Sequence, residues 1–291
     1  MTTTDPTRET TALDMDAVMA FVLRAVDELG ASLNTSLVVM GDKLGFYRAL
    51  ADDGPATADE LARRTGADAR YVREWLRAQA AGQYLDYDPD SQRFSLSPVH
   101  AAVLADETSP VFLPGFFQLV EGTTRDAPTI VEAARTGAGF GWGSHNSDVH
   151  VGCERFFLPG YRANLVAGWL PALEGVVDKL TRGAVVADVG CGHGASTILM
   201  AQAFPASRFV GVDAHAASIE TARQRAAEAG VAERIEFEAA DARSFGGRGY
   251  DLVTTFDSLH DMGDPVGAAR HVREAVAPDG TWMIVEPMAA D

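Results

Sequence analysis

The stretch AVVADVGCGHGAST, residues 184–197, decides how the rest of the chain is organised. It opens with a short apolar run that predicts a buried strand, continues through Asp188, and then places glycines at Gly190, Gly192 and Gly194. The residues that follow, ASTILM, favour the start of a helix. A strand, a glycine-rich turn and a helix form a unit whose backbone a ligand can approach closely, because no side chain holds the ligand away.

Apolar runs of the same kind recur further along the chain, and acidic residues stand at their ends. RFVGV ends in Asp213, IEFEAA ends in Asp241, and DLVTTF ends at Phe256 and Asp257. Strands are expected near 184–189, 208–213, 233–239, 250–256 and 281–286, and helices near 195–203, 216–229 and 264–276. This alternation predicts the α/β class, with a doubly wound parallel sheet over residues 183–291 that binds ligands at the carboxyl ends of its strands.

The motif DVGCGHG, followed by Asp213 and Asp241 at these spacings, resembles the class I S-adenosylmethionine-dependent methyltransferases. In the dinucleotide-binding fingerprint GxGxxG the third glycine comes one residue later, which favours the methyltransferase interpretation. The resemblance implies a Rossmann-like domain, S-adenosylmethionine as the cofactor, and transfer of its methyl group to a small-molecule acceptor, most simply at a hydroxyl oxygen.

The resemblance also implies roles for individual residues. Gly190 and Gly192 would hold the methionine portion of the cofactor, and Asp213 would accept hydrogen bonds from the ribose hydroxyls. Asp241 and the backbone of Ala242 would hold the adenine edge. The expected cofactor-binding set is Asp188, Gly190, Gly192, Asp213, Asp241, Ala242 and Phe256. Each aspartate alone has a simpler interpretation as a turn residue at a strand end, but three such elements in order favour the site.

The segment SLHDMGDP after the fourth strand contains His260, the expected catalytic residue. It is similar to the LHDW-type stretch of the O-methyltransferases, in which the histidine is the general base, although Met262 replaces the tryptophan. A hydroxyl that attacks a sulfonium methyl group must lose its proton, and a histidine suits that task. The alternatives are that His260 only caps the next helix, or that transfer proceeds chiefly by proximity and orientation.

The family resemblance also predicts two strands beyond the fifth, whereas the sequence ends with EPMAAD directly after it. The segment WMIVEP would then form an apolar sheet edge. We therefore expect a domain that is C-terminally incomplete, with the cofactor contacts of the first four strands less affected than catalysis.

Residues 1–13 read as a disordered tail, and residues 14–104 as a helix followed by a winged-helix domain. From Asp14 to Gly30 the apolar residues recur at helical spacing, from Met15 to Leu29. That apolar stripe packs either on its own domain or against a second subunit, and the second alternative, a homodimer, is favoured. Within the winged helix, Thr57 and Glu60 form a capping-box pattern.

A winged helix raises the question of DNA binding. Arg70, Arg73 and Arg77 share one face of the helix expected over residues 67–81, opposite an apolar face. They could form a recognition helix for the major groove, but in an acidic protein they are more often a solvated face paired with nearby acids. The second candidate function is therefore a cofactor-sensing DNA-binding regulator without catalysis.

Residues 105–182 are expected to connect the two domains through buried helices. Within them, residues 137–152, GAGFGWGSHNSDVHVG, are rich in glycine and without periodicity, which predicts a loop that serves as a substrate lid. A metal site in this loop is disfavoured, since no helical ligand spacing supports it, and no metal is expected. The candidate acceptor-binding residues from this connector are Trp142, His145, His150, Phe157 and Tyr161.

Composition limits the partners. The 291 residues carry a formal net charge of −17, with a pI near 4.7, and such a surface repels phosphate backbones and anionic lipids. Nucleic acid is therefore not an expected partner, and no apolar run approaches a membrane span. Two cysteines and the absence of an apolar signal core in the N-terminal segment favour a cytoplasmic protein.

Overall fold

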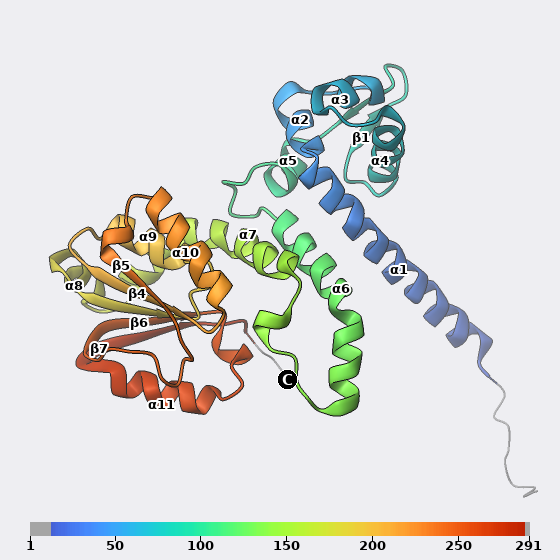
Figure 1. The fold of residues 1–291 in the computed structure, drawn as a ribbon. Coiled ribbons are helices and arrows are strands. Elements are labelled where there is room, and N and C mark those ends of the chain that lie inside the picture. The colour runs from blue at the N-terminus through green and yellow to red at the C-terminus, as the bar shows by residue number, and fades with distance from the viewer. Residues whose placement is uncertain (1–12, 289–291) are drawn as a thin grey trace, which may run out of the picture.

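The computed structural model describes residues 13–288, so the expected tail of residues 1–13 lies outside it except for Leu13. Figure 1 shows a small, mostly helical N-terminal domain, a connector of two long helices drawn in green, and a larger α/β domain. The first helix, drawn in blue, extends well beyond the small domain. Among the described residues, no helix combines the length and the apolar character that crossing a membrane requires.

Helix α1 spans Met15–Lys43 and begins at Asp14, whose carboxylate accepts hydrogen bonds from the backbone N–H groups of Asp16 and Ala17. The expectation that the helix stops at Gly30 is wrong. A glycine inside a helix costs only about 1 kcal/mol relative to alanine, and the flanking residues are good helix formers. The helix therefore runs on into the winged-helix domain.

The rest of that domain contains α2 (Phe46–Asp53), α3 (Ala58–Thr65), α4 (Ala69–Ala81), the hairpin β1 (Asp86–Asp88) and β2 (Arg93–Ser95), and α5 (Pro98–Leu104). The stretch VVMGDKLGFYRAL, residues 38–50, is by its sequence typical of one helix, but Gly45, with φ of +69°, separates α1 from α2. The capping box of Thr57 and Glu60 is confirmed. Trp75 fills the core, and buried Gln79 accepts a hydrogen bond from Tyr47 and donates one to Asn34.

The connector consists of α6 (Pro114–Thr136), a short 3-10 turn (Trp142–Ser144) and α7 (Ser147–Asn164). The expected loop of residues 137–152 is therefore too long, because Asn146 caps α7 and residues 147–152 are helical. The apolar stripe of residues 154–180 predicts one continuous helix there, and this prediction is also wrong. After Asn164 the chain forms a π-helical turn, a 3-10 turn at Leu170–Ala172 that contains Pro171, and then α8 (Val176–Arg182).

The α/β domain is built on a five-stranded sheet in the order β5-β4-β3-β6-β7, with every neighbouring pair parallel. The strands are β3 (Val185–Val189), β4 (Arg208–Asp213), β5 (Ile235–Ala239), β6 (Tyr250–Phe256) and β7 (Val276–Val285). The doubly wound parallel sheet predicted from the sequence is confirmed. The strand order reverses beside β3, so the turn after β3 opens at the point where such sheets bind ligands.

Three helices cover this sheet: α9 (Ala195–Ala203), α10 (Ala216–Glu228) and α11 (Pro265–Ala275). In Figure 1, α9 and α10 lie on one face and α11 lies on the other. The predicted turn ProAspGly at 278–280 lies within β7, where the pairing register with β6 shifts between Tyr250 and Leu252. Among the described strands, β7 is one edge of the sheet, with Met283 buried and Ile284 exposed.

Candidate cofactor and acceptor site

One pocket of about 720 Å³ lies at the carboxyl edge of the sheet, within the range of about 300–1,000 Å³ that is typical of small-molecule sites. Its walls come from the turns after β3, β4, β5 and β6, and from α7 and the segment before it. The predicted residues that line it are Gly190, Gly192, Asp213, Asp241, Ala242, Phe256, Trp142, His150, Phe157 and Tyr161. Asp188, His145 and His260 do not line it.

The glycine turn forms one wall. Gly190 and Gly192 have φ of +80° and +53°, a backbone region that glycine adopts without strain. A Cβ atom on Gly190 would collide with Ser258, whereas a Cβ on Gly192 would meet nothing within 4 Å and would occupy open space at the pocket wall. Glycine at 190 therefore allows the turn to pack against Ser258. Glycine at 192 leaves the pocket wall open for a ligand to approach the backbone.

Asp213 ends β4 and faces this turn. Its Oδ2 accepts a hydrogen bond of 2.9 Å from the Gly192 N–H, and its Oδ1 accepts one of 2.8 Å from the His215 N–H. Each carboxylate oxygen has a second lone pair, so Asp213 can still accept from two vicinal hydroxyls. The arrangement fits the ribose of an adenosine-containing cofactor, as the sequence predicts.

Asp188 has a different role from the one its position in the motif suggests. Its carboxylate is buried beneath the turn and accepts hydrogen bonds from Ser196 and Thr197, each 2.6 Å long, and from Thr254 at 2.8 Å. Burial raises the pKa of this carboxyl against the effect of the three hydroxyl donors. Asp188 therefore joins β3 to α9 and β6, and it supports the turn from behind.

Asp241, Ala242 and Arg243 line the part of the pocket where the sequence predicts the adenine edge of the cofactor. The Arg243 guanidinium donates two hydrogen bonds to the Asp241 carboxylate, at 2.7 and 2.8 Å. These bonds and the Arg243 N–H lower the pKa of Asp241 to about 2. Asp241 therefore carries a fixed negative charge that can accept a hydrogen bond from an exocyclic amine.

The opposite end of the pocket is aromatic and apolar. Phe157 and Tyr161 project from α7, with ring centroids 6.0 Å apart, and Tyr161 also packs against Phe256 at 5.4 Å. Burial raises the pKa of the Tyr161 hydroxyl, and it raises the pKa of the neighbouring Cys153 thiol to about 12. Both groups are therefore neutral near pH 7, and neither is a base for proton removal.

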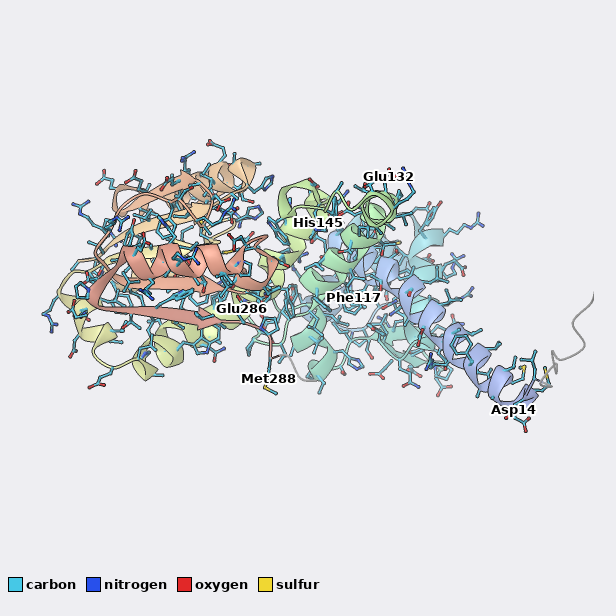
Figure 2. The ribbon with its side chains drawn as sticks, turned by 90° about the horizontal axis from the view of Figure 1, so that it is seen from below. Asp14, Phe117, Glu132, His145, Glu286 and Met288 are labelled. Atoms are coloured by element: carbon cyan, nitrogen blue, oxygen red, sulfur yellow. The ribbon has the colours of Figure 1, made fainter. Side chains whose placement is uncertain are left out.

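His260 lies beside this end of the pocket, between the lining residues Ser258 and Asp261. Its Nδ1 is hydrogen bonded to Glu286, which follows β7, and its Nε2 lies 3.5 Å from an Asp261 carboxylate oxygen. Figure 2 shows Glu286 at the end of β7 that faces the connector helices. The hydrogen bond to Glu286 raises the pKa of His260. A carboxylate only accepts, so Nδ1 carries the proton and Nε2 is the basic atom.

His145 and His150 are used differently. His145 Nδ1 is 2.9 Å from Asp126 of α6, outside the pocket, whereas the His150 ring lines the pocket and its Nε2 is 3.0 Å from the Trp142 carbonyl oxygen. Burial lowers the pKa of His150. His145 therefore fixes the segment before α7 to α6. His150 holds the backbone of Trp142, which lines the pocket.

Two functional pairs were not predicted from the sequence. Glu154 of α7 accepts a hydrogen bond of 2.9 Å from His193 of the glycine turn and also pairs with Arg225. Glu286 pairs with His260 across 26 residues of chain. No spacing signal marks either pair, because each joins segments that only the fold brings together.

Among residues 13–288, one group of histidine and carboxylate side chains is close enough together to hold a metal ion. Side-chain atoms of Asp257, His260 and Glu286 lie within 4.8 Å of one another. The loop residues considered from the sequence do not converge, because Asp148 pairs with Lys43 and Arg125 while His145 pairs with Asp126. The hydrogen bond between His260 and Glu286 is also what a positioned general base requires. The same three residues thus suit either a metal ion or a base, and the effect of a chelator on turnover distinguishes the two.

Family models match both domains. A methyltransferase domain matches residues 180–291, and an Rv2258c-like winged helix-turn-helix domain matches residues 32–106. Similar curated proteins include the mitomycin biosynthesis 6-O-methyltransferase of Streptomyces lavendulae, 26% identical over 81% of this chain and 69% of that protein. The 27-O-demethylrifamycin SV methyltransferase of Amycolatopsis mediterranei is 33% identical over 40% of each chain.

Solved structures with the same fold cover nearly the whole chain. The mitomycin 7-O-methyltransferase MmcR superposes with a TM-score of 0.69 at 22% identity, over 95% of this chain and 83% of that one. CalO1, a methyltransferase of calicheamicin biosynthesis in its SAH-bound form, has a TM-score of 0.60 at 20% identity, over 96% and 84%. The similarity thus includes the connector as well as the two matched domains.

Proposed function

We propose that this chain, an S-adenosylmethionine-dependent methyltransferase with an N-terminal winged helix-turn-helix domain, transfers the methyl group to a hydroxyl oxygen of a small-molecule acceptor. One observation carries the choice of a hydroxyl. A histidine whose Nδ1 is held by a carboxylate stands beside the aromatic end of the pocket, where an acceptor can lie next to the cofactor. Similar proteins whose names state O-methylation support the same choice.

The cofactor supplies an electrophilic methyl group, and the residues of this chain bind, orient and remove a proton. The glycine turn and Asp213 would hold the methionine and ribose portions, and Asp241 with Ala242 would hold the adenine edge. Gly192 offers open space where a side chain would block the ligand, so these residues fit the group. The acceptor proton would move to Nε2 of His260, and the resulting imidazolium would be stabilised by Glu286.

The acceptor end favours a flat, largely apolar molecule. Phe157, Tyr161 and Cys153 present neutral side chains to the pocket, while the carboxylates of Asp257 and Asp261 lie at its edge beside His260. Removing a hydroxyl proton is easiest where that hydroxyl is acidic. We therefore propose an aromatic or enolic hydroxyl as the acceptor group.

For assembly we propose a homodimer formed through α1. Six apolar residues recur along this helix at alternating steps of four and three, the spacing of a coiled-coil seam, and all are exposed: Met15, Met19, Val22, Val26, Leu29 and Leu33. Leu33 is 75% exposed and Leu29 is 64% exposed. A second copy of the same helix is the simplest partner for a self-complementary seam.

For localisation we propose the cytoplasm. Cys153 and Cys191 are both free thiols, one half-buried and one buried. Free thiols persist in a reducing compartment.

Turnover is tested directly by incubating the purified chain with S-adenosylmethionine and a panel of phenols, enols and aliphatic amines, while S-adenosylhomocysteine is measured by mass spectrometry. We expect product with hydroxyl acceptors, unchanged by a chelator. Methylation of amines alone would contradict the oxygen assignment. Activity that a chelator abolishes and a divalent cation restores would make Asp257, His260 and Glu286 metal ligands instead.

A further inference from the structure

Residues 137–146 connect α6 to α7 and cover one side of the pocket, with Gly141, Trp142 and Gly143 in its wall. The sequence suggested that this segment faces the acceptor. In the structure Gly143 of the segment lies against the ring of His215, and His215 is hydrogen bonded to Asp213 and Ser218. The segment therefore lies over the ribose side of the cofactor site.

The two ends of the segment differ in how they are held. At the α7 end, His145 and the Asn146 N–H both bond to Asp126 of α6. Figure 2 shows His145 in this segment, beside the connector helices. At the α6 end, Gly137 and Gly139 have φ of +72° and +76° with nothing near their Cβ positions. The segment is thus fixed by hydrogen bonds at its α7 end, and its two glycines can act as a hinge at its α6 end.

Its middle reaches the turn after β4 through a row of rings. Trp142 packs on His150 with centroids 5.1 Å apart, and His150 packs on His215 at 4.7 Å. His150 also donates to the Trp142 carbonyl oxygen at 3.0 Å. His215 is itself fixed, because its Nδ1 lies 2.9 Å from Ser218 Oγ and its backbone N–H bonds to Asp213.

The closest approach is made by backbone. A Cβ atom added to Gly143 would lie 3.0 Å from Cδ2 of the His215 ring, and all three of its nearest atoms belong to that ring. A contact this short is tighter than most that Cβ atoms make, so a methyl group here would require the ring or the segment to shift by a few tenths of an ångström. Ser144, the next residue along the chain, is exposed and lies outside the pocket lining, so there is room for a methyl group on its Cβ atom.

We propose that residues 137–146 are a latch over the cofactor, closed by Gly143 and Trp142 against His215, and that Trp142 and His150 position the cofactor rather than the acceptor. This inference rests on the proposed placement of the ribose at Asp213. An open latch would admit or release the cofactor, and the closed latch would exclude water from the ribose side and slow release.

The test uses S-adenosylhomocysteine as the probe, so that no acceptor is needed. Gly143→Ala should raise its Kd about tenfold and speed its dissociation, because overpacking against a fixed ring opposes closure. The matched control, Ser144→Thr, adds one methyl group to the adjacent, exposed residue, which does not line the pocket, and it should bind as the wild type does. Calorimetry gives the Kd, stopped-flow displacement gives the rate, and ligand-free melting temperatures report folding.

A third variant tests the contact itself. With His215→Ala as the background, the ring is gone and Gly143→Ala should no longer change the Kd. Equal Kd values for Gly143→Ala and Ser144→Thr would overturn the latch, as would an effect of Gly143→Ala that persists without the His215 ring. If instead Asp213→Ala leaves the Kd unchanged, the ribose placement fails and the latch has no cofactor to cover.

Discussion

His260 is the residue on which the chemistry depends most, and its protonation gives a direct prediction. The hydrogen bond from Nδ1 to Glu286 raises the pKa of His260, and the base acts only when Nε2 is unprotonated. The rate should therefore fall as pH drops through a pKa above the ordinary value of about 6.5. Glu286→Gln removes the carboxylate, so the acid limb should move to lower pH, and His260→Ala should lower turnover about a hundredfold.

The pKa of His260 can be read without an acceptor, from the NMR signal of its ring across pH, assigned by comparison with His260→Ala. His260 is about half exposed, so solvent screens the pair and only the direction of the shift is predicted. If the signal titrates at the same pH in wild type and Glu286→Gln, Glu286 does not tune this base. A His260→Ala variant with wild-type turnover would leave proximity and orientation as the source of catalysis.

At the scale of elements, the connector depends on close contact between α6 and α7. A Cβ atom on Gly152 of α7 would lie 2.5 Å from the Leu119 backbone nitrogen and 2.6 Å from the Gly115 carbonyl oxygen. Backbone atoms cannot turn aside, so Gly152→Ala should lower the free energy of unfolding by about 1–3 kcal/mol.

The same helix supplies the control for that prediction. Gly160 of α7 has nothing within 4 Å of its Cβ position, so Gly160→Ala should raise stability by about 0.5–1 kcal/mol through helix propensity. Urea denaturation of both variants measures the two changes. If Gly152→Ala also raised stability, helix propensity and not the contact with α6 would decide the stability of α7.

The elements that the sequence predicts well are those with local signals. β4 and β6 begin and end where their apolar runs do, and α9 begins directly after the glycine turn. The misses have a common physical reason: tertiary packing overrides a local signal. Gly30 does not stop α1, because the surrounding residues favour the helix, and residues 147–152 are helical because α6 packs against them despite their polar, glycine-containing sequence.

The residues of the candidate site also fall into two groups, those with a local sequence signal and those without one. Gly190, Gly192, Asp213 and Asp241 follow strand ends, so their positions along the sequence predict their meeting at one edge of the sheet. Glu286 and Glu154 have no such signal, because their partners come from distant segments. Asp188 shows the limit of a motif: it stands inside the glycine signature, but strand alternation turns it toward the core rather than the pocket.

The seam of α1 leads to a prediction about assembly. The double substitution Met19→Glu and Val26→Glu places two charges in the middle of the seam and should convert a dimer to a monomer. Ala17→Glu with Ala31→Glu adds the same charge on a different, exposed face of the helix and should leave the dimer intact. Light scattering gives the mass of each. A dimer that survives the seam substitutions would place the interface elsewhere.

At the scale of the whole molecule, a basic face on one helix of the N-terminal domain belongs to a chain that is acidic overall. The winged helix presents Arg70, Arg73 and Arg77 on α4, a face that a DNA-binding protein would use. Two of these are paired within the domain: Arg73 lies 4.0 Å from Asp59 and Arg77 lies 3.4 Å from Glu74. The chain as a whole has a formal net charge of −17.

We therefore predict that the intact protein does not bind duplex DNA at physiological salt. Three arginines of which two are paired release few counterions from DNA, and the acidic surface repels the phosphates at the long range where steering acts. Fluorescence anisotropy with a labelled random duplex and with sheared genomic fragments, with and without S-adenosylmethionine, measures this. Arg70→Glu with Arg73→Glu and Arg77→Glu is the control, and it should leave the anisotropy unchanged. Binding that these charge reversals abolish, and that the cofactor alters, would make the winged helix a regulator's DNA-binding domain, and the methyltransferase domain would then act as its sensor.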